Sequence, residues 1–364
     1  MRYAVIMAGG SGTRLWPMSR AREPKQLIPF INGKSLLQVA FDRLEGLVPA
    51  ENRCVCAGQT HAEVITEALE GFGPEQFIGE PVGRDTLNAV AYASAVIAKK
   101  DPGAVIAFFT ADHIIEPVDE FQAIVEHGFE VAEHEAHSLV TFGIAPTEAA
   151  TGYGYLQLGD SIDATARVVR EFKEKPGKET AEEYLAAGAD RYLWNSGMFV
   201  WRASTLLDCV RRYHPENHGG VMKIADAWDT PERDAVLGAV FPELKKISVD
   251  FAVMEPASRD DAVLVAAVPM PLSWLDVGSW PAFAGICPKD DAGNAIGGGR
   301  SLLTDTRNTL VASSDPDHLI ATLGCDDLIV IHTPGATLVC TKEAAEQIKQ
   351  VHGAVGKQFG GDLV

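Results

Sequence analysis

The chain has 364 residues, of which 46% are hydrophobic and 22% charged, and its net charge is −19. This length exceeds one ordinary domain, so we expect a large hydrophobic core and a smaller one. The acidic balance argues against general binding to nucleic acid or to anionic membranes, since both need a basic partner surface. No apolar run is long enough to predict a membrane span or a signal peptide, so we expect a cytoplasmic protein. The six cysteines lack paired CxxC spacing, which predicts free thiols rather than a zinc site.

The first 110 residues alternate between strand and helix patterns. The predicted elements are an apolar strand from Val5, helices over 35–47, 60–70 and 89–99, and strands over 54–57 and 105–109. Ser35 and Gln38 are spaced as a capping box for the first helix. This alternation predicts an α/β fold with a Rossmann-like, mostly parallel (mixed) sheet covered on both faces, in which ligands gather at the carboxyl ends of the strands.

The rest of the chain is less regular. Strands are predicted over 138–144, 168–172, 192–201 and 263–268, and helices over 203–213 and from the cap Thr180 onward. Residues 287–300 have the Pro, Gly and Asp content of a linker. Beyond them, short β pieces over 309–312, 318–323, 328–332 and 337–340 precede a helix over 343–352 and a loose tail at 360–362. We therefore expect a catalytic domain over 1–286 and a small domain over 301–364, built as a short left-handed β-helix.

A glycine-rich loop follows the opening strand. Gly9, Gly10 and Gly12 allow positive φ and close backbone approach, so their N–H groups can converge on phosphate oxygens. Arg14 and Lys25 add cationic donors just behind the loop. A turn after an edge strand is the alternative, but it gives no reason for these two cations. The spacing matches neither a dinucleotide fingerprint nor a P-loop.

Two aspartates at strand ends are candidate metal ligands. Asp112 follows the strand over 105–109, and Asp276 stands between two tryptophans. Oxygen ligands of this kind suit Mg²⁺, which usually accompanies a nucleoside triphosphate. Asn195 lies in an apolar strand, so its amide needs partners, either a sugar hydroxyl or a bulged backbone.

Ordered motifs across the chain resemble one enzyme family. The motifs are MAGGSGTRLWPMSRAREPKQ, GEPVGRDT, TADH, TGYGY, FKEKP, WNSGMF, SVDFAVME and WLDVGSW. Together they cover residues 1 to about 285 and resemble the sugar-phosphate nucleotidyltransferases, with RLWPMSR typical of the mannose-1-phosphate guanylyltransferase (GDP-mannose pyrophosphorylase) branch. The C-terminal stretch resembles that family's β-helical domain. The chain leaves no room for an added isomerase domain, so it is similar to the monofunctional form.

The resemblance implies a reaction and a set of partners. GMP would pass from GTP to α-D-mannose 1-phosphate by in-line attack on the α-phosphate with Mg²⁺ as cofactor, giving GDP-mannose and pyrophosphate. A homodimer is also implied. The sugar phosphate is already a competent nucleophile, so no serine, cysteine or histidine nucleophile is needed.

The resemblance also implies roles for individual residues. Arg14 would stabilise the leaving pyrophosphate, Lys25 would lie near the α-phosphate, and Asp112 and Asp276 would bind the metal. These four are the expected catalytic residues. The expected nucleotide-binding residues are Ala8, Gly9, Gly10, Gly12, Thr13, Glu80, Arg84, Asp85, Asn88 and Asp112. The expected sugar-phosphate-binding residues are Gly154, Glu174, Lys175 and Asn195.

One segment departs from the family pattern. Family members often have RNTAPA where this chain has Arg84 to Ala89, RDTLNA. Asp85 either accepts the N1–H and amino donors of guanine or caps the helix that follows.

Three alternative functions remain at this point. One is a nucleotidyltransferase of the same fold for another base or sugar 1-phosphate. The second is a non-catalytic regulatory paralogue that binds GDP-mannose, although it would be expected to lose some of the four catalytic residues. The third is a metal-dependent glycosyltransferase, which would be expected to carry a DxD motif where this chain has Asp112-His113-Ile114.

Overall fold

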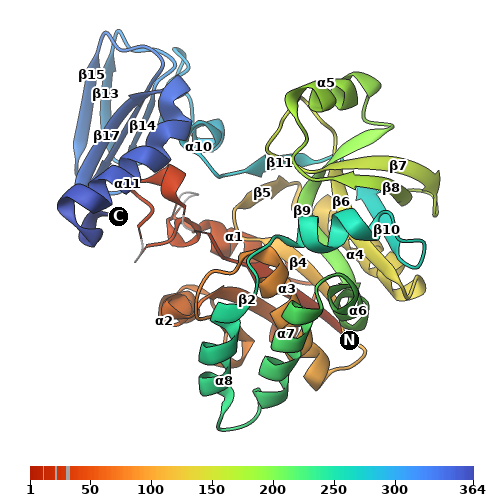
Figure 1. Cartoon of the computed structure of the whole chain (residues 1–364). Coiled ribbons are helices and arrows are strands. Elements are labelled where there is room, and N and C mark those ends of the chain that lie inside the picture. Colours follow the sequence, from red (N-terminus) through yellow and green to blue (C-terminus); the bar gives the residue numbers. More distant parts are fainter. Residues whose placement is uncertain (11, 21–22, 30–32) are drawn as a thin grey trace. The chain divides into compact units, whose positions relative to one another are not determined.

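The structure is a computed structural model that describes residues 1–10, 12–20, 23–29 and 33–364 (Figure 1). Its contacts divide the chain into two compact units. The first unit contains Met1–Gly9, Ala40–Ala111 and Ile115–Trp274, and the second contains Gly10–Val39, Asp112–Ile114 and Leu275–Val364. This division differs from a single boundary at 287–300, because the segment behind the glycine loop packs with the C-terminal residues. Ser11, Ala21 and Arg22 of that segment lie outside the described residues.

A nine-stranded sheet forms the centre of the first unit, in the order β3-β2-β1-β4-β9-β6-β10-β8-β7. Its strands are β1 (Arg2–Met7), β2 (Arg53–Gly58), β3 (Phe77–Glu80), β4 (Val105–Thr110), β6 (Ser138–Ile144), β7 (Tyr155–Ser161), β8 (Arg167–Lys173), β9 (Tyr192–Arg202) and β10 (Leu264–Pro269). The β3-β2-β1-β4 half is parallel throughout, whereas β9 runs antiparallel to its neighbours. The predicted mixed sheet is confirmed.

Helices accompany this sheet in the first unit. They are α2 (Ala62–Ala68), α3 (Asp85–Lys100), α4 (Val118–His134), α5 (Lys178–Ala187), α6 (Ala203–Tyr213), α7 (Pro215–Ala227), α8 (Arg233–Val240), a π-helix η7 (Asp250–Met254) and α9 (Glu255–Ala257). Helices α4 and α6 contact strands of the sheet, whereas α7 packs on α3 and α6, and α8 packs on α7. Phe108 and Trp201, fully buried on neighbouring strands, pack with ring centroids 5.4 Å apart. Helix α5 begins two residues before the predicted cap Thr180, with Gly177 at its N-cap. Among the helices of the described residues, none is both long and apolar enough to cross a membrane.

Short helices connect these elements. The 3₁₀ helices are η1 (Thr13–Leu15), η2 (Lys25–Leu27), η3 (Ala50–Asn52), η4 (Gln59–His61), η5 (Pro74–Gln76), η6 (Phe241–Glu243), η8 (Lys342–Gln347) and η9 (Gly361–Leu363). Helix α1 (Leu36–Asp42) is shorter than the predicted 35–47. Its capping box is present, since Ser35 N–H donates to Gln38 Oε1 at 2.7 Å and Gln38 N–H donates to Ser35 Oγ at 3.2 Å.

Parallel β coils dominate the second unit. Strands β12 (Ala295–Gly297), β14 (Leu310–Ser313), β16 (Leu328–Thr333) and β17 (Ala336–Thr341) form one sheet, and β13 (Arg300–Thr304) pairs with β15 (Leu319–Leu323). Leu310 stands in register with Ala295 on one side and Ile329 on the other, so successive coils stack their apolar side chains, as a β-helix requires. Strand β12 lies within the segment predicted as a linker. The remaining elements are β5 (His113–Glu116), β11 (Ser273–Asp276), which pairs with β5, α10 (Trp280–Ile286) and α11 (Ile348–Phe359).

The segment behind the glycine loop is anchored within the second unit. Trp16 is 5% exposed, and its carbonyl oxygen accepts a hydrogen bond from Trp280 Nε1 at 3.0 Å. Its own indole nitrogen donates to the carbonyl oxygen of Leu363 at 2.7 Å. The prediction of a loose C-terminal tail was therefore wrong, because this tail supplies a hydrogen-bond acceptor to the loop segment.

Candidate active site

The glycine loop requires its glycines for two physical reasons. Gly10 has φ +107° and Gly12 has φ +56°, a region that other residues rarely adopt. A Cβ atom on Gly12 would lie 2.4 Å from Ser19 Oγ and 3.0 Å from Lys25 Cβ. The backbone therefore passes directly against the lysine, as a phosphate cradle with a cationic wall requires.

Lys25 and Asp112 form a largely buried ion pair in the second unit. The Lys25 ammonium donates to Asp112 Oδ2, and the side chains are 10% and 21% exposed. Burial by itself would raise the pKa of Asp112, but the Lys25 ammonium and the His113 ring outweigh burial and lower it. Asp112 is thus ionised at neutral pH, which a metal ligand needs to be.

Asp112, His113 and Asp276 bring three ligand atoms within 4.8 Å of one another. The backbone holds the two strand ends together, because Val277 N–H donates to the Asp112 carbonyl oxygen at 3.0 Å. The two carboxylates fit a hard divalent cation, whereas the imidazole is a more usual ligand for transition metals. This cluster could hold a divalent metal. Sequence reasoning missed His113, although its place directly after Asp112 at a strand end was an available signal.

Arg14 lies beside the same cluster. A Cβ atom on Gly278 would lie 3.0 Å from Arg14 Nη2 and 3.1 Å from Asp276 Oδ1. The guanidinium is 44% exposed, and its Nη1 stands 3.4 Å from Glu346 on η8, a long contact that stabilises little at the surface. The structure thus groups Arg14, Lys25 and the metal cluster in one unit, with the guanidinium partly open to solvent.

A second group of predicted residues gathers in the first unit. Asn195 N–H donates to the Gly154 carbonyl oxygen at 2.8 Å, and a Cβ atom on Gly154 would lie 2.6 Å from Glu174 Oε2. Lys175, at φ +45°, donates from Nζ to Glu174 Oε1 at 2.6 Å. Glu174 is only 6% exposed. Gly154 and Lys175 therefore lie against the buried Glu174 carboxylate, and Asn195 joins the group through the Gly154 backbone.

The Asn195 amide has partners on two sides. Thr141 Oγ1 donates to Asn195 Oδ1 at 2.7 Å, and Asn195 Nδ2 donates to Asp250 Oδ1 at 2.9 Å. The register between β6 and β9 shifts next to this residue, so a bulge is present as well. The side chains of Thr141 and Asp250 thus hold the Asn195 amide, whereas the sequence analysis considered only a sugar hydroxyl or a bulged backbone as its partner. Asp250, on η7, had no role in the sequence prediction.

Aromatic rings stand near this group. Tyr153 packs against Trp194 with centroids 5.2 Å apart and against Trp274 with centroids 5.4 Å apart. Ring faces of this kind suit the apolar faces of a sugar. Tyr153 belongs to the TGYGY motif and Trp194 to the WNSGMF motif of the sequence analysis.

The predicted base-binding residues lie at the start of α3 and the end of β3. Glu80 is 8% exposed, and burial together with the nearby Asp85 carboxylate raises its pKa to about 7. Asp85 has φ +67° and accepts from the Thr86 N–H at 2.9 Å, so it is not the N-cap, which is Arg84. Arg84 Nε is buried without a hydrogen-bond partner among the described residues.

Asn88, one of the predicted nucleotide contacts, has hydrogen-bond partners within the protein. It is fully buried, and Nδ2 donates to the carbonyl oxygens of Arg84 and Lys245 at 2.7 and 2.9 Å. Its Oδ1 accepts from Asn217 Nδ2 at 2.7 Å. The amide is used inside the protein, where it ties α3 to the segment at Lys245, so we leave it out of the proposed ligand contacts.

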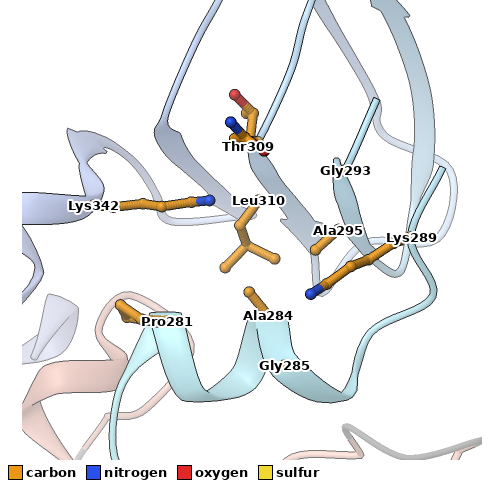
Figure 2. A pocket seen from close by; sticks show the side chains of 10 residues that line it. Pro281, Ala284, Gly285, Lys289, Gly293, Ala295, Thr309, Leu310 and Lys342 are labelled. Atoms are coloured by element: carbon orange, nitrogen blue, oxygen red, sulfur yellow. The ribbon is translucent and has the colours of Figure 1, made fainter. Parts of the chain in front are cut away.

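A separate pocket of about 220 Å³ lies in the second unit (Figure 2). Its floor is apolar, with Ala284, Ala295 and Leu310, and the side chains of Lys289 and Lys342 point into it from opposite sides. None of the ten residues that line it belongs to the predicted site.

Comparisons with known proteins identify the relatives of this chain. A family model described as nucleotidyl transferase matches residues 3–292, and one described as MannoseP isomerase/GMP-like beta-helix domain matches residues 299–353. The chain is 37% identical over 353 residues to xanthan biosynthesis protein XanB of Xanthomonas campestris pv. campestris (strain B100), covering 95% of this chain and 72% of that protein. It is 36% identical over 356 residues to a mannose-1-phosphate guanylyltransferase of Klebsiella pneumoniae, covering 96% and 73%.

A solved structure agrees with these relatives. The crystal structure of mannose-1-phosphate geranyltransferase from Thermus thermophilus superimposes with a TM-score of 0.85 at 31% identity, covering 97% of this chain and 99% of that one. The resemblance inferred from the motifs is confirmed. The chain therefore belongs to the nucleotidyl transferase family, together with the mannose-1-phosphate guanylyltransferases.

Proposed function

We propose that the protein transfers GMP from GTP to α-D-mannose 1-phosphate, giving GDP-mannose and pyrophosphate. The observation that carries this proposal is the grouping of Lys25, Asp112 and Asp276 beside Arg14 on a glycine cradle. The named activity of the relatives, at 35–36% identity, supports the choice of substrates.

The chemistry needs alignment and charge neutralisation rather than a protein nucleophile. A phosphate oxygen of the sugar 1-phosphate attacks the α-phosphorus of GTP, and the bond to the bridging oxygen breaks as pyrophosphate leaves in line. Lys25 neutralises charge near the α-phosphate, and Arg14 stabilises the leaving group. Mg²⁺, when held by Asp112 and Asp276, supplies further neutralisation of the phosphate oxygens.

The group around Glu174 suits the sugar half of the acceptor. A hexose presents hydroxyls that both donate and accept hydrogen bonds, and this group offers the buried Glu174 carboxylate and the Asn195 amide. Lys175 supplies a cation for the sugar phosphate. Because Gly154 has no Cβ atom, the Glu174 carboxylate can lie against its backbone without a clash.

Glu80, Arg84 and Asp85 are the proposed base contacts. Guanine presents N1–H and amino donors, for which carboxylates are good acceptors. The exposed Asp85 carboxylate accepts from the Thr86 N–H through Oδ1, and its other oxygen is the proposed acceptor for the base.

A homodimer is part of the proposal. Strands β13 and β15 expose Leu302, Leu319 and Leu323 at 59%, 55% and 73% on one small sheet. Apolar side chains gathered in this way favour contact with a second copy. Sedimentation equilibrium tests this, and a monomer at micromolar concentration would contradict it.

A substrate panel tests the proposed function. Pyrophosphate release is measured with GTP, ATP, UTP and dTTP, each against mannose 1-phosphate and other hexose and heptose 1-phosphates. We expect the largest kcat/KM for GTP with mannose 1-phosphate. A larger value for another pair would reassign the substrates, and no release with any pair would indicate a binding protein.

A further inference from the structure

Asp250 begins an unusual backbone segment next to the proposed sugar group. Residues Asp250–Met254 form a π-helix, a geometry that often marks functional sites. The segment is held at its start, because Val249 N–H donates to Thr86 Oγ1 at 2.9 Å. The first side chain of the π-helix, Asp250, contacts Asn195 on β9.

Asp250 completes a chain of hydrogen bonds that fixes Asn195. The amide oxygen of Asn195 accepts from Thr141, and its amide nitrogen donates to Asp250. The two contacts set which way the amide faces. An amide has two N–H groups and two acceptor sites, so one donor and one acceptor of Asn195 remain, at fixed positions, beyond the contacts that the described residues make.

The Asp250 carboxyl also interacts electrostatically with Glu174 and Lys175 of the sugar group. Burial and the Glu174 carboxylate raise the pKa of Asp250 to about 7, while Lys175 acts in the opposite direction. A purely structural partner for one amide gives no reason to place a second carboxyl beside Glu174, because two such groups repel each other. Several acceptors around one small space are what a polyhydroxylated ligand requires.

We propose that Asp250 is a positioning residue for the sugar: it holds Asn195 in the orientation that receives the hexose hydroxyls of the acceptor. This inference rests on the proposed function, since it assigns a role within the sugar half of that reaction. The carboxylate acts through Asn195, and the nucleotide half of the reaction does not depend on it.

The test separates the two substrates. Asp250→Ala removes the acceptor of the Asn195 amide, and we expect KM for mannose 1-phosphate to rise at least about tenfold, as for loss of a hydrogen bond to a charged group. KM for GTP should not change. Asp250→Asn retains an oxygen acceptor and should restore most of the affinity. Glu255→Gln, on the adjoining α9, is the matched control, because Glu255 pairs with Lys173 and Arg259 instead.

A second variant approaches the amide from its other side. Thr141→Val removes the hydroxyl that donates to Asn195 Oδ1 at nearly constant volume, and we expect the same selective rise in KM for mannose 1-phosphate. Equal rises for both substrates, or unchanged KM values in the folded Asp250→Ala and Thr141→Val proteins, would overturn the inference. An inactive wild type would instead overturn the proposed function, and the inference with it.

Discussion

The ammonium of Lys25 donates a hydrogen bond to Oδ2 of Asp112, 87 residues further along the chain, and both side chains are largely withdrawn from solvent. One residue follows the glycine loop and the other follows the end of β4. The pair therefore joins the phosphate cradle to the metal cluster, and a change on either side alters the electrostatic surroundings of the other.

Lys25→Ala should lower turnover about 10²–10³-fold, the loss typical of removing one donor that stabilises transition-state charge. Thermal unfolding of the variant checks that the protein is still folded. Lys342→Ala is the control, since Lys342 is a partly exposed lysine of the same unit outside the site. Near-normal turnover in a folded Lys25→Ala protein would remove this lysine from the mechanism.

Gly12→Ala should abolish most activity and destabilise the protein. The new Cβ would collide with Ser19 Oγ and press on Lys25, and the φ of +56° adds strain of about 1 kcal/mol or more. Gly46→Ala is the matched control, because Gly46 has φ +83° but no atom within 4 Å of the added Cβ. Turnover and denaturant unfolding are measured for both. Equal behaviour of the two variants would contradict a close approach at Gly12.

Asp276→Asn should weaken binding of a divalent cation. Calorimetric titration with Mn²⁺ measures this without any turnover, and the expected effect is at least about tenfold in Kd, because a charged oxygen ligand is lost. Asp317→Asn is the control at an exposed carboxylate. Unchanged Mn²⁺ affinity in Asp276→Asn would place the cation elsewhere.

Asp250→Asn should gain stability relative to wild type as the pH rises. The folded pKa of Asp250 is raised to about 7 from 3.8, so the folded protein holds a proton that the unfolded chain releases. The wild-type free energy of unfolding therefore falls between about pH 4 and pH 7, by on the order of 4 kcal/mol for this group. Urea unfolding at pH 5 and pH 8 measures the difference between the two proteins.

Glu80 also contributes to the pH dependence of the free energy of unfolding, because its pKa is raised to about 7 as well. Some loss of stability should therefore persist in Asp250→Asn, and Glu80→Gln should remove it separately. An identical pH profile in wild type and Asp250→Asn would show that the Asp250 carboxyl ionises normally in the folded protein.

Local patterns in the sequence predicted most elements. Helix α6 runs over Ala203–Tyr213 as expected, because its apolar residues recur at helical spacing beside one sheet face. The strand β4, from its apolar run, and the glycine loop were likewise predicted from local sequence. Residues that the motifs single out also gather, since Gly10, Gly12, Asp112 and Asp276 fall in one unit.

Features that depend on distant packing were not predictable in this way. Sequence alone does not tell whether the Asn88 amide contacts a ligand or the carbonyl oxygen of Lys245. Its burial depends on α7 and on the segment after η6, which are distant in the sequence. His113 and Asp250 gain their places from pairings between strands and from a π-helix without a sequence pattern. The division into units follows contacts of Gly10–Val39 that no local composition shows.

The most direct test of GMP transfer follows an isotope through one turnover. Mannose 1-phosphate labelled with ¹⁸O in its phosphate oxygens is incubated with GTP, the protein and Mg²⁺. The masses of the products are then measured by mass spectrometry. Attack of the sugar phosphate on the α-phosphorus predicts that all label appears in GDP-mannose and none in pyrophosphate. Label in pyrophosphate, or the absence of GDP-mannose, would contradict the proposed function.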